Sequence, residues 1–432
     1  MTDQDKRPDT ETRQDGDDSG AVTTTDQKPD AGKPAQDEPS IGQRFLRELT
    51  TGSTALTILS VVLALLIGAI LIVVSDPDVH AAASYFFSRP GDTFAAMWTS
   101  ASEAYAAMFS GAIIDFDEYT VGRALRPFAD SLTYATPLIA AGLAVALAFR
   151  TGLLNIGAQG QLILGAILAG YIGFAIDLPP VVHVVVAMLA GFVGGAIWGG
   201  IAGFIKATRG AHEVIVTIML NYIALFLLAY LLTTDPFQRE GEDLPRSPFM
   251  LPTAELWRPI EGSRLNLGLV FALLAAVYTW WLLNRSTMGF RFKAVGFNPH
   301  AATTAGISVG RSYTTVMFIC GGLAGIAGAT QVMGTSLHLH GAIAEQLGFD
   351  AITVALLGRS SPIGTVLAAI LFGALRAGAT TMQAQTQTPI DIVLVVQALI
   401  VLFIAAPPLV RAVFRIKVRA TRPVAPGSGG LA

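Results

Sequence analysis

Long apolar runs alternate with short polar segments from residue 54 to residue 406. Ten runs are apparent: Thr54–Val74, Ser131–Phe149, Gln161–Ile176, Val181–Ile205, Val214–Leu232, Leu267–Leu283, Ser312–Met333, Phe349–Leu357, Ile363–Ala379 and Ile390–Ala406. Most approach the roughly 20 apolar residues that a helix needs to cross a bilayer. The pattern predicts an all-α, polytopic membrane helical bundle with interrupted helices and about ten transmembrane segments. The alternative is eight crossings plus a re-entrant hairpin at Phe349–Leu357, which is too short to span alone.

A polar, glycine-rich break at residues 152–161 separates two of these runs. Its glycines oppose a regular helix, and it carries three uncharged amides at Asn155, Gln159 and Gln161. Lipid tolerates irregular backbone only where protein covers it or water lines it. The break therefore predicts a site or pathway at membrane depth.

Two more polar residues, Asn221 and Tyr222, lie inside the apolar run Val214–Leu232. Amide side chains offer both a donor and an acceptor, which suits hydroxyls and nucleobase edges better than ions. One interpretation is that these two residues and the three amides line a pathway for a neutral polar solute. The other is that the amides tie neighbouring helices together.

A second interrupted region follows Leu357, where Gly358, Pro362 and Gly364 separate two apolar runs. Paired interrupted segments in the two parts of a membrane protein indicate a transport site between structural repeats. The two breaks are therefore expected to act together, and an internal repeat is left open.

The charge is unevenly distributed in a chain that is 52% hydrophobic, 14% charged and −3 overall. Residues 1–40 contain 11 acidic and 5 basic residues, a net charge of −6, and no aromatic residue. Such a segment cannot bury enough apolar surface to fold alone, so residues 1–50 are predicted to form a disordered acidic tail. Residues 51–410 would form the transmembrane domain, and residues 411–432 a basic tail.

Basic residues in short loops indicate which side of the membrane is cytoplasmic. They concentrate at 206–209, within 284–311 and after residue 410. This distribution predicts that both termini are cytoplasmic and that the acidic segments 75–130 and 233–266 lie outside.

The basic segment 284–311 is about 28 residues long, more than a simple helix connection requires. Aromatic and apolar residues alternate in it with Arg291 and Lys293. We expect a short helix along the membrane surface that is presented to a cytoplasmic partner. The alternative is an interfacial loop whose charge only fixes the topology.

The sequence offers no catalytic constellation. His212-Glu213 begins like a zinc-protease motif, but Val216 replaces its second histidine. His338 and His340 have no cysteine or carboxylate beside them in the sequence, which is weak evidence for a metal. We expect no catalytic residue, no metal site and no bound cofactor in this chain.

Four stretches carry a resemblance to a known family: Ala144–Gly165, His212–Tyr222, Gly289–His300 and Leu356–Gly364. They resemble the permease subunits of bacterial ABC importers in the branched-chain amino acid/simple sugar permease family, and most closely its nucleoside-uptake branch. The resemblance covers about Phe128–Ala406. The family often has Glu where Gln159 stands, and Gly-Asn where Arg359-Ser360 stand.

This resemblance implies a multi-pass subunit in the bacterial plasma membrane that forms the path for nucleosides, with simple sugars as the nearest alternative. An ion-coupled secondary transporter is a more distant one. The implied partners are a cytoplasmic ATPase that uses ATP, an extracellular substrate-binding lipoprotein and a second permease subunit, identical or different. Nucleic acid is not an expected partner. The resemblance assigns ATPase coupling to six residues: Gly289, Arg291, Lys293, Gly296, Asn298 and Pro299.

Overall fold

The computed structural model describes residues 53–116, 120–260 and 262–414. The chain divides into Met1–Gly52 and Ser53–Ala432, and every described residue belongs to the second unit. The predicted acidic tail, and the predicted basic tail beyond residue 414, therefore lie outside the described residues.

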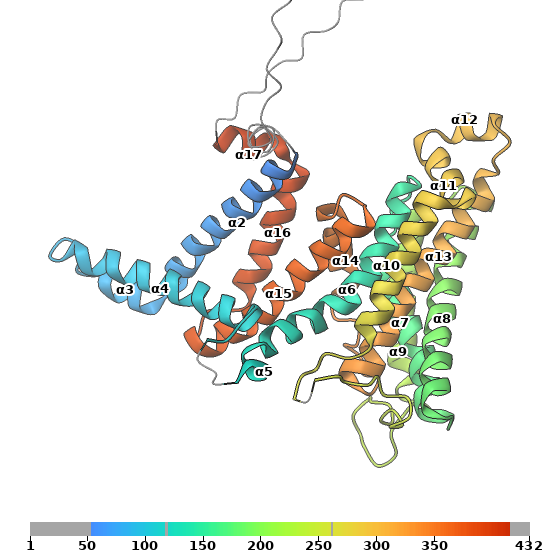
Figure 1. Ribbon diagram of the computed structural model, residues 1–432, viewed down its shortest axis with the longest axis horizontal. Helices are drawn as coiled ribbons and strands as arrows, with labels where there is room; N and C mark the ends of the chain where they lie inside the picture. Colours follow the sequence, from blue (N-terminus) through green and yellow to red (C-terminus); the bar gives the residue numbers. More distant parts are fainter. Residues whose placement is uncertain (1–52, 117–119, 261, 415–432) are drawn as a thin grey trace, which may run out of the picture. The chain divides into compact units, whose positions relative to one another are not determined.

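The described part of the chain is a succession of helices (Figure 1). Their bounds are α2 Ser53–Ser75, α3 Pro77–Ala83, α4 Pro90–Ala112, α5 Val121–Ala124, α6 Arg126–Arg150, α7 Ala158–Ala175, α8 Pro180–Arg209, α9 Glu213–Leu231, α10 Gly268–Arg285, α11 Thr287–Phe297, α12 Pro299–Thr304, α13 Val309–Thr330, the π-helix η1 Gln331–Ser336, α14 Leu347–Leu357, α15 Pro362–Thr386, α16 Asp391–Ala405 and α17 Pro407–Val413.

Eight helices among the described residues are long and apolar enough to cross a membrane, and the bent pair α16–α17 would make a ninth. The predicted all-α polytopic fold is confirmed, although the count falls below ten. The difference is α14, whose 11 residues extend for about 16 Å at 1.5 Å per residue. This is half of the roughly 30 Å of a bilayer core.

Two hydrophobic clusters hold the described helices together. The larger one is built mainly from α6, α7, α13 and α14. The smaller one joins α2 and α4 to α15 and α16. Helices α6 and α13 are buried over most of their length, whereas only 28% of α2 and of α9 is buried, as expected of helices that face lipid.

Helices α8 and α13 lie side by side (Figure 1) and approach closely through glycines. A Cβ at Gly195 would overlap the carbonyl oxygen of Gly321, and a Cβ at Gly321 would overlap that of Gly195. Small residues that let backbones meet are typical of helix packing in membranes.

Candidate functional site

The first predicted break is the connection between α6 and α7, residues 151–157. Gly152 has a φ of +74°, which turns the chain where a residue with a Cβ would be strained. The break is shorter than predicted because α7 already begins at Ala158. Gln159 and Gln161 therefore belong to the first turn of α7.

Asn155 and Gln161 are buried, and their side chains are hydrogen-bonded to each other. Asn155 Nδ2 donates to Gln161 Oε1 at 3.0 Å, and Gln161 Nε2 donates to Asn155 Oδ1 at 3.1 Å. Asn155 Oδ1 also accepts from the N–H of Gly157 at 3.1 Å. The two amides thus brace the connection against the first turn of α7.

Asn221 on α9 completes this arrangement. Its Nδ2 donates to the carbonyl oxygen of Ile156 at 2.9 Å, and its Oδ1 accepts from the N–H of Gly160 at 2.8 Å. Tyr222 points elsewhere, because 55% of it is exposed on the helix surface. The contacts of Asn155, Gln161 and Asn221 favour the interpretation that they tie helices together. Their role in a pathway stays a prediction.

Gln159 makes a different contact, with the segment that precedes α14. Its Nε2 donates to the carbonyl oxygen of Glu345 at 2.7 Å, and its Oε1 accepts from the N–H of Gly348 at 2.7 Å. One side chain at the start of α7 therefore fixes the start of α14, almost 190 residues further along the chain.

A polar cavity lies beside this segment. It has two adjoining parts of about 700 and 400 Å³, which share Thr133, Tyr134, Arg264 and Thr335 as lining residues. The larger part reaches Asp130 of α6 and Thr380 and Thr381 of α15. The five predicted pathway residues are not among the described residues that line either part.

An ion cluster marks the boundary of the smaller part of the cavity. Arg376 of α15 is paired with Glu345, and its Nη1 lies 3.8 Å from Asp350 Oδ2. Arg258 also lines this part and donates to the carbonyl oxygen of Gly334 at 3.3 Å. Guanidinium donors, carboxylate acceptors and hydroxyls thus face one space, which suits an uncharged solute with several hydrogen-bonding groups.

Sequence reasoning missed Arg376, although a signal was present. Arg376 lies inside the apolar run Ile363–Ala379, where a charged residue is expensive and is a functional candidate by default. Glu345 and Tyr134 had no such signal, because their importance depends on helices that meet only in the folded chain.

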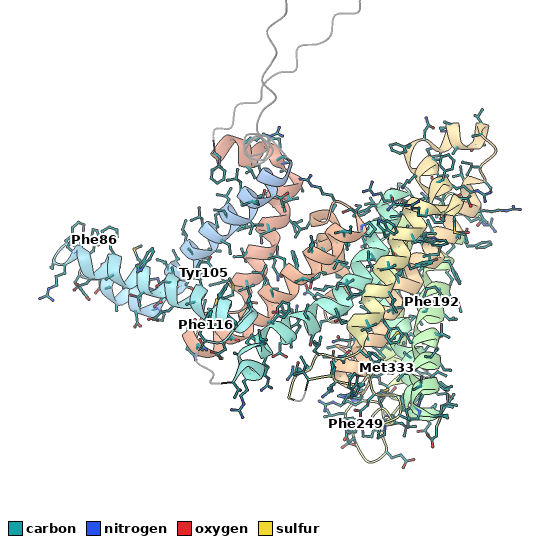
Figure 2. All side chains as sticks on the ribbon, in the orientation of Figure 1. Phe86, Tyr105, Phe116, Phe192, Phe249 and Met333 are labelled. Carbon is teal, nitrogen blue, oxygen red and sulfur yellow. The ribbon has the colours of Figure 1, made fainter. Side chains whose placement is uncertain are left out.

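The long connection between α9 and α10, residues 232–267, packs on the segment that follows η1. Arg246 and His340 form an isolated β-bridge, and the ring of Phe249, labelled in Figure 2, lies 5.4 Å from that of His338. Burial lowers the pKa of His338, and Arg239 and Arg246 lower it further. The described residues contain no group of three or more His, Cys, Asp or Glu side chains that could hold a metal.

The predicted surface helix is present as α11, followed by the short α12. Ser286 caps α11 by accepting from the N–H of Gly289, and Asn298 caps α12, with Pro299 at its first position. Gly289 and Gly296 pack tightly against neighbouring backbone, whereas Arg291 is exposed. Lys293 Nζ donates to Asn284 Oδ1 at 3.4 Å.

Comparison with known proteins gives a consistent result. The family model for the branched-chain amino acid transport system / permease component matches residues 128–405. The guanosine ABC transporter permease protein NupP of Bacillus subtilis is 42% identical over 317 residues, 72% of this chain and 88% of that protein. A nucleoside ABC transporter permease protein of Lactococcus lactis is 36% identical over 290 residues, 65% of this chain and 79% of that protein. A glucose ABC transporter permease protein of Haloferax volcanii is 34% identical over 284 residues, 63% of this chain and 74% of that protein. No solved structure matches this chain.

Proposed function

This chain belongs to the family of branched-chain amino acid transport system permease components, and we propose that it is the membrane-spanning permease subunit of an ABC importer for nucleosides. The observation that carries the proposal is the polar cavity between membrane-spanning helices of a chain that is similar, over most of its length, to a guanosine permease.

The cavity has the size and chemistry for such a solute. Ligand sites usually measure about 300–1,000 Å³, and the larger part of this cavity alone measures about 700 Å³. Its walls offer the hydroxyls of Thr133 and Thr335, the ring of Tyr134 and the guanidinium of Arg264. Ribose hydroxyls and a base edge need this mixture of donors, acceptors and aromatic surface. Gln159 would hold the segment beside the cavity in place, and the paired amides of Asn155 and Gln161 would hold the start of α7.

The energy for transport would come from a separate ATPase. The exposed face of α11 and α12 supports docking of that partner, since its basic side chain at Arg291 is free of the bundle. Basic residues concentrate on the same side, so we place both chain termini and this segment in the cytoplasm of a bacterial cell. An extracellular binding lipoprotein and a second permease subunit would complete the importer.

Reconstitution tests the function directly. Proteoliposomes would contain this chain with a candidate ABC ATPase, and uptake of labelled guanosine would be followed with and without ATP. We expect uptake only with both the partner and ATP. Uptake by this chain alone under an ion gradient would instead identify a secondary transporter. Competition by excess glucose, but not by inosine, would favour the sugar permease.

Charge reversal tests the docking assignment. Arg291→Glu should reduce co-purification of the ATPase several-fold, because it places a carboxylate where the partner meets a guanidinium. Arg246→Glu, in the connection at the opposite end of α10, is the matched control and should not affect co-purification. Equal recovery of the ATPase with both variants would contradict the docking assignment.

A further inference from the structure

Helix α14 is held at both of its ends by side chains from other helices. It is an apolar helix of 11 residues, too short to cross a bilayer core by itself. It begins beside the polar cavity and ends in the tight turn Gly358–Ser361, which leads into α15. A rigid element with two separate attachments transmits a displacement from one end to the other.

The turn after α14 is held by Arg150, the last residue of α6. Arg150 Nε donates to the carbonyl oxygen of Ser360 at 2.9 Å, and its Nη2 donates to that of Arg359 at 3.4 Å. Arg359 and Ser360 have φ values of +53° and +51°. This region is unfavourable for residues with a Cβ, so the turn depends on outside contacts such as these.

The backbone of Arg150 contacts the predicted docking segment. A Cβ at Gly296 of α11 would lie 2.5 Å from the carbonyl oxygen of Arg150, and a Cβ at Gly152 would lie 3.4 Å from the Gly296 Cα. The end of α6 and the end of α11 are therefore packed backbone to backbone. Arg150 thus touches α11 with its main chain and the turn after α14 with its side chain.

The opposite end of α14 borders the cavity. Gln159 holds the segment through Glu345 and Gly348, and Arg376 pairs with the Glu345 side chain. Leu347, the first residue of α14, lines the smaller part of the cavity together with Glu345 and Arg376. A displacement of α14 along its axis would therefore move part of the cavity wall.

We propose that α14 couples the α11–α12 segment to the cavity, and that Arg150 is the positioning residue that makes this connection. The proposal rests on the proposed function, since it takes α11–α12 as the ATPase docking segment. When the ATPase moves α11, the end of α6 moves with it, and Arg150 draws the turn and α14 along. The Glu345–Arg376 pair at the cavity then separates or re-forms.

The planar guanidinium is suited to this task. Its fixed fork of N–H donors reaches two successive carbonyl oxygens at once, which a single lysine ammonium does not reproduce with the same geometry. Arg209 offers a matched comparison, because it also is the exposed last residue of a spanning helix, α8. Changing Arg209 removes the same charge from a helix end without touching α14.

The test uses the full complex in proteoliposomes and measures guanosine taken up per ATP hydrolysed. In Arg150→Gln, we expect uptake per ATP to fall at least tenfold, with ATPase co-purification and basal hydrolysis within twofold of the unchanged complex. Arg209→Gln should leave all three quantities unchanged. If Arg150→Gln does not fold, Arg150→Lys provides the test. It keeps the positive charge but lacks the paired N–H donors of the guanidinium, so uptake per ATP should fall in this variant as well.

Two outcomes would overturn the proposal. A normal uptake-to-hydrolysis ratio in the Arg150 variants would remove Arg150 from the coupling route. Loss of ATPase co-purification would make Arg150 part of the docking surface instead. Absence of ATP-dependent uptake in the unchanged complex is a distinct result, because it would defeat the proposed function together with this inference.

Discussion

Replacement of Gln159 by leucine tests whether one amide fixes the start of α14. Leucine has a similar volume but removes both 2.7 Å hydrogen bonds, to the Glu345 carbonyl and from the Gly348 N–H. The lost bond to Glu345 costs about 1 kcal/mol, and the Gly348 N–H left without a partner costs about 1–3 kcal/mol. The expected loss in the free energy of unfolding is therefore about 2–4 kcal/mol.

Two further variants distinguish the loss of these two hydrogen bonds from a general effect of apolar substitution. Gln159→Glu keeps an acceptor for the Gly348 N–H but turns a carboxylate oxygen toward the Glu345 carbonyl, so repulsion between these oxygens adds to the loss of that hydrogen bond. Gln346→Leu changes an exposed amide in the same segment. A surface change of this kind usually stays within about 0.5 kcal/mol.

The assay is reversible denaturant unfolding in mixed micelles, with guanosine uptake by the reconstituted complex as a second measurement. Both changes at Gln159 should destabilise the protein more than Gln346→Leu. If Gln159→Leu is no more destabilising than Gln346→Leu, the two hydrogen bonds do not hold α14, and the reasoning from their geometry is refuted.

Three other changes have defined outcomes. Gly195→Ala places a methyl group against the Gly321 carbonyl and should destabilise the protein by about 1–3 kcal/mol in thermal unfolding, whereas Gly91→Ala in α4, whose added Cβ meets no atom within 4 Å, should be close to neutral. Glu345→Arg or Arg376→Glu alone should abolish uptake, and the double exchange should restore part of it, because the pair then re-forms with opposite orientation. The pKa of His338 is lowered from 6.5 by burial, so the folded chain binds fewer protons there than the unfolded chain. The free energy of unfolding is therefore highest above the ordinary pKa of histidine, and it decreases as the pH falls below that value. The hydrogen-exchange protection factor in the α9–α10 connection, corrected for the intrinsic pH dependence of exchange, should fall as the pH drops below about 6.5, and should fall less in His338→Gln.

The apolar pattern predicted most of the fold because spanning helices must satisfy their backbone internally and expose apolar side chains to lipid. Each of the ten apolar runs overlaps a helix. The pattern did not predict α4, Pro90–Ala112, which was expected to be part of an external polar segment. Alanines dominate this helix and acids interrupt it, so its packing against α15, rather than its hydropathy, accounts for its place in the fold.

The site was harder to predict because its contacts join distant parts of the sequence. The bond from Gly160 to Asn221 spans 61 residues, and that from Gly348 to Gln159 spans 189. Sequence identified Gln159 as unusual, but only the folded chain shows that it holds α14. Periodicity alone gives no information on which helix a polar side chain faces. The cavity residues Tyr134 and Glu345 were therefore not predicted.

The two positions at which the family resemblance led us to expect other residues contact or follow the two ends of α14. Gln159 stands where the resemblance led us to expect Glu, and its amide donates to the Glu345 carbonyl, which a carboxylate cannot do. Arg359-Ser360 stand where Gly-Asn would adopt the left-handed turn more easily, yet Arg359 Nη2 donates to Thr57 Oγ1 of α2 at 3.2 Å. The chain thus accepts an unfavourable backbone at one end and gains a contact with another helix. Both departures change how α14 is held, while the cavity residues face a solute. Differences in coupling between this chain and its relatives should therefore follow α14, and differences in solute range should follow the cavity walls.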